Sequence, residues 1–178
     1  VEPGSYSSSG FSNDNKYFFF ITDVGEEFSY LVKYEIETGK EEVLFQTNWD
    51  VMYSYLSESE KYRVTAVNED GKNTLFIKNV VNNSDVFFPE IPDGDIKGVR
   101  ISKSEKKIRL TVGTSKSPNN IYVYDMGSKK LKKLTETLNP EINANDLVEA
   151  EVVRYPSFDG LEIPAIYYKP QDATKRNK

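Results

Sequence analysis

One stretch of this 178-residue chain, Gly113-Thr114-Ser115-Lys116-Ser117, begins like a nucleophile elbow, the strained strand-to-helix turn that exposes a catalytic serine. It lacks the closing glycine and no helical pattern follows it, so we expect an ordinary loop. The chain contains no histidine and no cysteine. A Ser-His-Asp triad, a Cys-His pair or a histidine-based metal site therefore cannot be built from these residues alone, and no catalytic residue is assigned.

Two polar stretches carry oxygen ligands of the kind that bind calcium, Asn13-Asp14-Asn15 and Asp93-Gly94-Asp95. Neither has the further spaced carboxylates of a calcium loop, and these residue types are the usual residues of turns. We therefore interpret both as turns and predict no metal and no other cofactor. Asn82-Asn83-Ser84 is a glycosylation sequon, a three-residue pattern that often arises by chance.

Aromatic and basic side chains offer two candidate binding surfaces. Four tyrosines could line a surface, although packing between strands is the favoured interpretation: Tyr53, Tyr55, Tyr122 and Tyr124. Four lysines could form a basic groove, although a charged sheet edge that discourages edge-to-edge pairing is favoured: Lys129, Lys130, Lys132 and Lys133. No substrate-binding residue is assigned from either set.

The elements that must position these residues recur with a period of 45. Ser12, Ser57 and Ser102 each open a polar turn, within FSNDNK, LSESEK and ISKSEK. Between the turns the sequence predicts four short strands per unit, rich in Tyr, Phe, Val and Ile. A fixed period of this length with four strands is typical of β-propeller blades. Trp49-Asp50 matches the WD dipeptide of other propellers, but without a Gly-His partner we interpret the match as coincidence.

The repeat ends where Leu147 takes the place of the serine. We predict blades over about residues 5–49, 50–94 and 95–137, the second with its last strand ending at Phe87-Phe88. A linker follows over residues 138–150, with a turn or short helix capped by Asn139. A hairpin over residues 151–170 and a disordered tail over residues 171–178 complete the predicted organisation.

The hairpin carries the most specific pattern in the chain, RYPSFDGLEIPAIYYKP at residues 154–170. It resembles the opening hairpin of the α/β-hydrolase domain in the prolyl oligopeptidase family of serine peptidases, which includes acylaminoacyl and dipeptidyl peptidases. The repeat before it resembles a TolB-like or dipeptidyl-peptidase-type propeller. The predicted fold is therefore all-β, a partial β-propeller of about three four-stranded antiparallel blades followed by a β-hairpin that begins an α/β-hydrolase domain.

The resemblance implies the propeller portion of a serine peptidase that hydrolyses short peptides, acting as substrate gate and scaffold. The triad would lie outside residues 1–178, so this chain alone is expected to be inactive. The alternative is a non-catalytic TolB-like scaffold for protein–protein interaction.

The expected partners are peptide substrates of the parent enzyme. The net charge of −5 argues against nucleic acid, and no apolar run is long enough to span a membrane. A truncated propeller exposes sheet faces, which predicts self-association. The compartment stays open, with the cytoplasm favoured over the periplasm or secretion.

Overall fold

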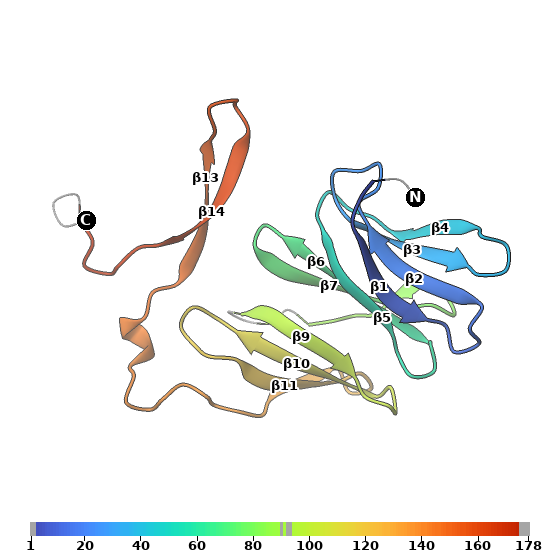
Figure 1. The fold of residues 1–178 in the computed structure, drawn as a ribbon. Coiled ribbons are helices and arrows are strands. Elements are labelled where there is room, and N and C mark those ends of the chain that lie inside the picture. Colours follow the sequence, from blue (N-terminus) through green and yellow to red (C-terminus); the bar gives the residue numbers. More distant parts are fainter. Residues whose placement is uncertain (1–2, 90, 92–93, 175–178) are drawn as a thin grey trace. The chain divides into compact units, whose positions relative to one another are not determined.

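The structure is a computed structural model that describes residues 3–89, 91 and 94–174. These residues form fourteen strands and one short 3₁₀ helix (Figure 1). The chain divides into two compact units. Unit 1 lies within Val1–Glu69 and Asn73–Phe88, and unit 2 lies within Asp70–Lys72 and Pro89–Lys178.

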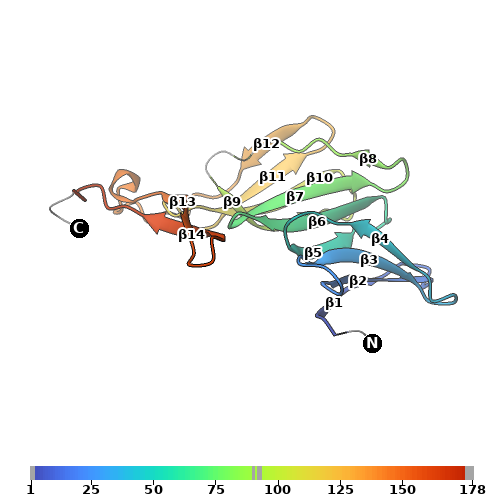
Figure 2. The same ribbon diagram turned by 90° about the horizontal axis from the view of Figure 1, so that it is seen from above.

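Each of the three predicted blades is a four-stranded sheet in which every strand pairs with its neighbour in sequence. The first sheet consists of β1 (Tyr6–Phe11), β2 (Tyr17–Thr22), β3 (Tyr30–Glu35) and β4 (Glu41–Phe45). The second consists of β5 (Val51–Leu56), β6 (Tyr62–Glu69), β7 (Lys72–Asn79) and β8 (Ser84–Asp85). The third consists of β9 (Asp95–Ile101), β10 (Lys107–Gly113), β11 (Asn120–Asp125) and β12 (Lys130–Lys133). Figure 2 shows β12 beside β11 at the edge of the third sheet.

The expected strand through Phe87-Phe88 is wrong, because β8 is only two residues long. Val86 still donates its N–H to the carbonyl of Ile77 at 2.8 Å, but no regular pairing continues beyond it. Two apolar residues in sequence suggested a longer strand, yet Phe87 is largely exposed. Pro89 follows and cannot donate to a ladder, which favours an early end of pairing here.

The three repeat serines occupy equivalent surroundings, which confirms the predicted register. In each turn the serine N–H donates to the carbonyl five residues ahead and the serine carbonyl accepts from the N–H three residues ahead. The serine Oγ also accepts the N–H of the fifth residue, at 3.0 Å for Ser12 and Ser57 and 3.2 Å for Ser102. The residue before the lysine of each turn has positive φ, and so Asn15, Glu60 and Glu105 adopt the left-handed conformation.

We expect Ser57→Ala to lower the free energy of unfolding by about 1 kcal/mol, because it removes the acceptor of the Tyr62 N–H at a buried serine. Ser102→Ala makes the same change in a more exposed turn and should cost less. Urea titrations of both variants measure the difference. Equal losses would show that burial does not set the strength of this hydrogen bond.

The core of unit 1 lies between its two sheets. Ile21 and Leu31 of the first sheet pack with Val51 and Val67 of the second. The partly buried Trp49 packs against this cluster and lies near Phe28, with ring centroids 6.3 Å apart. β2 is apolar on successive residues because both of its faces are covered by side chains.

The opposite face of the first sheet carries an aromatic row. Phe11 lies against Phe18, with ring centroids 4.9 Å apart, and Phe18 and Tyr6 each lie 6.0 Å from Phe20. Tyr6 and Phe11 are more than half exposed. Exposed apolar patches of this kind promote association between protein molecules.

We therefore expect the chain to self-associate through this aromatic row. Light scattering is expected to give a mass above that of one chain, and Phe11→Ser should lower it because it removes the most exposed ring of the row. Val81→Ser provides the control, since Val81 is an exposed apolar residue in a turn. A single-chain mass for the unaltered protein would contradict the prediction.

The second unit continues past β12 into a turn, a 3₁₀ helix at Ala144–Asp146 and the hairpin of β13 (Ala150–Pro156) and β14 (Glu162–Tyr168). The N-cap of the helix is Asn143, whose side chain accepts the N–H of Asn145, and not the predicted Asn139. Asn139 instead accepts the N–H of Glu141 at 3.0 Å, which closes a turn before the helix begins.

The tail predicted over residues 171–178 is described only in its first half. The Ala173 N–H donates to the carbonyl of Pro170 in a turn, and the Gln171 side chain donates to the Asn145 carbonyl. Residues 175–178 lie outside the described part of the chain. The domain boundaries remain predictions.

Candidate functional site

The serine-containing stretch after β10 is a loop, as expected. The Thr114 N–H donates to the Ser117 carbonyl at 3.0 Å, and the Lys116 N–H donates to Thr114 Oγ1 at 2.9 Å. β11 begins at Asn120, so a strand and not a helix follows. The backbone therefore does not form a nucleophile elbow.

This loop contacts the start of the hairpin within unit 2. Ser115 Oγ accepts the N–H of Ala150 at 2.9 Å, and Lys116 Nζ lies 3.7 Å from Glu149 Oε2. A cavity of about 700 Å³ lies beside these contacts, with lining residues that include Asp95, Ser115, Asn119, Glu149, Ile166 and Tyr168. Asp95 forms an ion pair with Lys97, and Glu149 forms one with Lys116. The charges of these two carboxylates are therefore largely neutralised. The arrangement suits binding and positioning and does not supply a catalytic set.

Asn120 holds the loop in place, and the sequence analysis did not identify it. Its amide donates to Ser117 Oγ at 3.0 Å and to the Pro118 carbonyl at 3.2 Å. Its carbonyl oxygen accepts from Thr135 Oγ1 and from the Thr137 N–H, both at 3.1 Å. The only sequence signal was a polar residue at a position where the two earlier repeats have Tyr30 and Leu75.

The hairpin turn has the hydrogen bonds that its sequence requires. The Ser157 N–H donates to the Leu161 carbonyl at 2.8 Å, and the Gly160 N–H donates to the Ser157 carbonyl at 3.0 Å. Gly160 has a φ of 85°, which a residue with a side chain rarely adopts. Asp159 Oδ1 accepts the Leu161 N–H at 3.1 Å. The aspartate and the glycine of the Ser-x-Asp-Gly pattern are thus each explained by a role in the turn.

These hydrogen bonds affect the pKa of the Asp159 carboxyl group. The hydrogen bond from the Leu161 N–H, and then that from Ser157, lower the pKa of Asp159 below its usual 3.8. Ser157→Ala should raise this pKa while leaving it below 3.8, because the Leu161 N–H remains. Carboxyl carbon shifts in an NMR pH titration report it.

The sign of the pH effect follows from the lowered pKa. The support that ionised Asp159 gives to the turn is fully present above pH 3.8 and is lost as the pH falls through its lower value in the folded chain. Asp14 provides a matched control in unit 1, since Ser12 and Lys16 lower its pKa and Ser157→Ala leaves those bonds untouched. An unchanged Asp159 pKa in the variant would contradict the role of Ser157.

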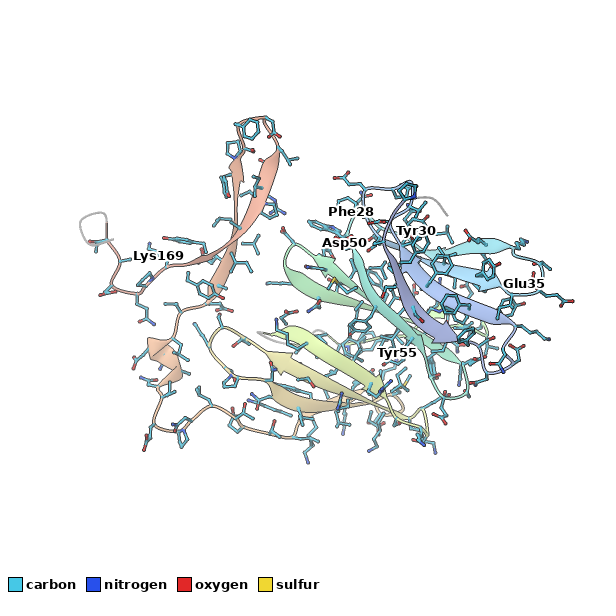
Figure 3. All side chains as sticks on the ribbon, in the orientation of Figure 1. Phe28, Tyr30, Glu35, Asp50, Tyr55 and Lys169 are labelled. Atoms are coloured by element: carbon cyan, nitrogen blue, oxygen red, sulfur yellow. The ribbon has the colours of Figure 1, made fainter. Side chains whose placement is uncertain are left out.

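Each face of the hairpin carries exposed apolar side chains, next to Glu151 on one face and to Arg154 and Glu162 on the other. Val153, Tyr155 and Tyr167 lie on one face, and Ile166 and Tyr168 lie on the other. Phe158 and Leu161 extend from the turn and are also exposed. Figure 3 shows side chains on both sides of this hairpin, with Lys169 labelled just after β14. A strand pair with apolar side chains on both faces is typical of a layer that is covered on both sides.

The other candidate residues take ordinary structural roles. Asp14 accepts from Ser12 Oγ at 2.6 Å and from the Lys16 N–H at 3.1 Å, as in a turn. Asp93 lies outside the described residues, and no cluster of three or more metal-binding side chains occurs within the described ones. The sequon residue Asn82 is exposed and accepts from Ser84 Oγ at 2.8 Å.

Two of the four tyrosines pack into their sheets, and the lysines lie on a sheet edge as the favoured interpretation proposed. Tyr124 is fully buried, and this burial raises the pKa of its hydroxyl. Tyr53 is half-buried, and burial raises the pKa of its hydroxyl too. The lysine-rich strand β12 is an edge strand, and Lys133 Nζ pairs with Glu136 at 2.7 Å. Within the described ranges, no helix is both long and apolar enough to cross a membrane.

Trp49-Asp50 links the two sheets of unit 1. Asp50 Oδ1 accepts the Ser29 N–H at 3.0 Å and Ser29 Oγ at 3.1 Å. The Val51 N–H then donates to the Ser29 carbonyl at 3.1 Å. Figure 3 labels Phe28 and Asp50 at this junction. The dipeptide therefore joins consecutive repeats, a role unrelated to the position of the WD signature within a blade.

Sequential four-stranded sheets built on one repeated turn define a β-propeller type of fold. Comparison with solved structures agrees. Prolyl oligopeptidase B from Galerina marginata matches at 16% identity with a TM-score of 0.68, over 96% of this chain and 25% of that one. Puromycin hydrolase matches at 14% identity with a TM-score of 0.71, over 95% of this chain and 27% of that one. A structure from a study of two prolyl endopeptidases matches at 13% identity with a TM-score of 0.59, over 96% of this chain and 25% of that one.

The chain spans about a quarter of the length of these solved chains. The predicted fold class is confirmed, since the chain has the fold of the propeller portion of prolyl oligopeptidase structures. No protein-family model matches the sequence, and the search of curated proteins gave no match.

Proposed function

We propose that this chain is the propeller portion of a serine peptidase of the prolyl oligopeptidase family, together with the first hairpin of its α/β-hydrolase domain. The hairpin with exposed apolar side chains on both of its faces is the observation that carries the proposal. The likeness to prolyl oligopeptidase and puromycin hydrolase structures supports the same assignment for the sheets before it.

The hairpin argues for a second layer-forming domain because two strands alone do not bury enough apolar surface to be stable in water. Seven large apolar residues of the segment are exposed: Val153, Tyr155, Phe158, Leu161, Ile166, Tyr167 and Tyr168. A scaffold made only of propeller blades would have no use for these side chains. In a hydrolase domain they would be covered by the central sheet and its helices.

In this proposal the sheets act as substrate gate and scaffold, and the catalytic residues come from the hydrolase domain. The propeller would restrict entry so that short peptides reach the nucleophile and folded proteins do not. The loop at residues 114–119 supports a mechanical role, because its contacts through Ser115 and Lys116 connect the third sheet to the start of the hairpin.

The test uses the native protein that carries this sequence, isolated with an antibody raised against residues 1–178. We expect a fluorophosphonate probe to label it and chromogenic short peptides to be hydrolysed, with an unfolded protein of the same cleavage sequence cleaved far more slowly. The isolated 178-residue chain is the matched control. It should neither label nor turn over substrate, since losing a triad serine or histidine costs roughly a factor of 10⁶.

A native protein that takes up no probe and hydrolyses no peptide would overturn the peptidase proposal. It would favour the alternative, a non-catalytic TolB-like scaffold. Cleavage of folded proteins as fast as short peptides would keep the peptidase assignment and overturn the gate.

A further inference from the structure

Unit 1 contains a groove of about 440 Å³ between the sheet β1–β4 and the sheet β5–β8. Its lining is mixed. The apolar part comes from Phe19, Leu44, Phe45, Leu56, Phe76 and Val80, and charged side chains from both sheets complete it. Phe45 and Phe76 contact each other across the two sheets, with ring centroids 4.9 Å apart. A cavity of this size with aromatic walls and several polar groups falls within the range of small-ligand sites.

Three cations line this groove, Lys33, Arg63 and Lys78. Lys33 is paired with Glu42 and Lys78 is exposed, so Arg63 is the cation best placed to hold a ligand inside. On β6 its side chain shares a face with Thr65 and Val67, because alternate residues of a strand point the same way. Val67 belongs to the core between the sheets, which places Arg63 on the same inner face. The Arg63 guanidinium carbon lies 4.9 Å from the centre of the Phe19 ring.

The guanidinium is held by this ring and by longer-range attraction to carboxylates, with no hydrogen bond or ion pair to any of the described residues. Both nearby carboxylates bind other partners. Glu42 forms an ion pair with Lys33 at 2.5 Å, and Glu60 accepts the backbone N–H of Asn13. The five N–H donors of Arg63 thus remain available to a ligand, in the fork that matches a carboxylate.

The surroundings make an anionic partner favourable. Burial lowers the pKa of Arg63, Glu42 and Glu60 partly offset this effect, and the resulting pKa is about 10. A charged group that has lost much of its water is stabilised by a hydrogen-bonded counterion. Apolar walls next to a cation call for a ligand that has both an apolar body and a negative charge.

We propose that this groove binds an aromatic carboxylate, with the carboxylate on Arg63 and the ring against Phe45 and Phe76. The ligand is a free aromatic acid or the C-terminal residue of a peptide, two sources of one chemistry. The proposal concerns unit 1 by itself and does not depend on the chain being part of a peptidase.

The test titrates the 178-residue chain with N-acetylphenylalanine and follows backbone amide shifts by NMR. We expect saturable shifts at Phe19, Phe45 and Phe76. N-acetylphenylalaninamide has the same ring without the charge and should bind at least about tenfold more weakly, since hydrogen bonds to charged groups are about twice as strong as neutral ones. A tetra-alanine peptide ending in phenylalanine, with a free or an amidated terminus, distinguishes a peptide terminus from a free acid.

Arg63→Gln should weaken binding of N-acetylphenylalanine by about tenfold to a hundredfold, because it removes a charge-assisted pair. Arg63→Lys keeps the charge but loses the forked geometry of the guanidinium. Its affinity for N-acetylphenylalanine should lie between those of the unaltered chain and of Arg63→Gln. Arg109→Gln changes an exposed arginine on β10 and should leave binding unchanged. Dispersed amide spectra establish that each variant is folded.

Three results would overturn the proposal. They are the absence of saturable shifts in the unaltered chain, equal binding of the acid and its amide, or unchanged binding by folded Arg63→Gln. If Arg63→Gln does not fold, the comparison of acid with amide on the unaltered chain decides the question by itself.

Discussion

Leu31→Ala is expected to lower the free energy of unfolding of unit 1 by about 2 to 5 kcal/mol, the usual range for a buried leucine truncated to alanine. Leu31 is completely buried and packs with Ile21, Val51 and Val67 between the two sheets. The surrounding strands are fixed by their ladders and cannot fully close the space. Urea denaturation with hydrogen exchange of the β3 amides measures the loss.

Ile121→Ala is the matched control, because Ile121 stands 90 residues later at the equivalent register position. Leu31 pairs with Ile21 in the first sheet as Ile121 pairs with Thr111 in the third. Ile121 is 38% exposed, so its truncation should cost clearly less than that of Leu31. Equal losses of stability in the two variants would show that Leu31 is not packed more tightly than Ile121.

Asn120→Ala is expected to destabilise unit 2 by about 2 to 4 kcal/mol. The side chain is 3% exposed and forms four hydrogen bonds, two as donor and two as acceptor. Alanine removes all four hydrogen bonds, and each one lost costs about 0.5 to 1.5 kcal/mol. The Thr137 N–H loses this acceptor, whereas the Pro118 carbonyl still accepts from Ser117 Oγ and Thr137 Oγ1. Thermal unfolding and the exchange rate of the Thr137 amide measure the effect.

Asn119→Ala tests whether burial and bonding, rather than residue type, set this cost. Asn119 is the preceding residue, is exposed and has no side-chain hydrogen bond to the described residues. Its replacement should change stability by less than about 0.5 kcal/mol. A similar loss in both variants would contradict the role assigned to Asn120.

The parts of the fold that the sequence could predict are those specified by local chemistry. The turns at Ser12, Ser57 and Ser102 need a serine acceptor, a residue with positive φ and strands on either side, and all three requirements lie within a few residues. The hairpin turn is local in the same sense, since the hydrogen bonds of Asp159 and Gly160 join them to Leu161 and Ser157.

The remainder depended on packing between sheets, which a periodic pattern does not encode. Leu31, Phe76 and Ile121 recur in register, yet their exposures of 0%, 41% and 38% differ with what covers each sheet. Arg63 is one polar residue in an alternating strand, and its contact with Phe19 on another sheet leaves no trace in its own segment. Sequence reasoning therefore found the repeated framework and missed both the groove and the buried Asn120.

Pairing of each strand with its successor affects how the chain acquires its structure. Every ladder joins segments that are separated by one turn, so no distant segments have to meet before a sheet can form. Low contact order of this kind is associated with rapid folding, and any of the hairpins can act as the starting point. We therefore expect individual sheets to form early and independently, with the slower step in unit 1 being the packing of its two sheets against each other.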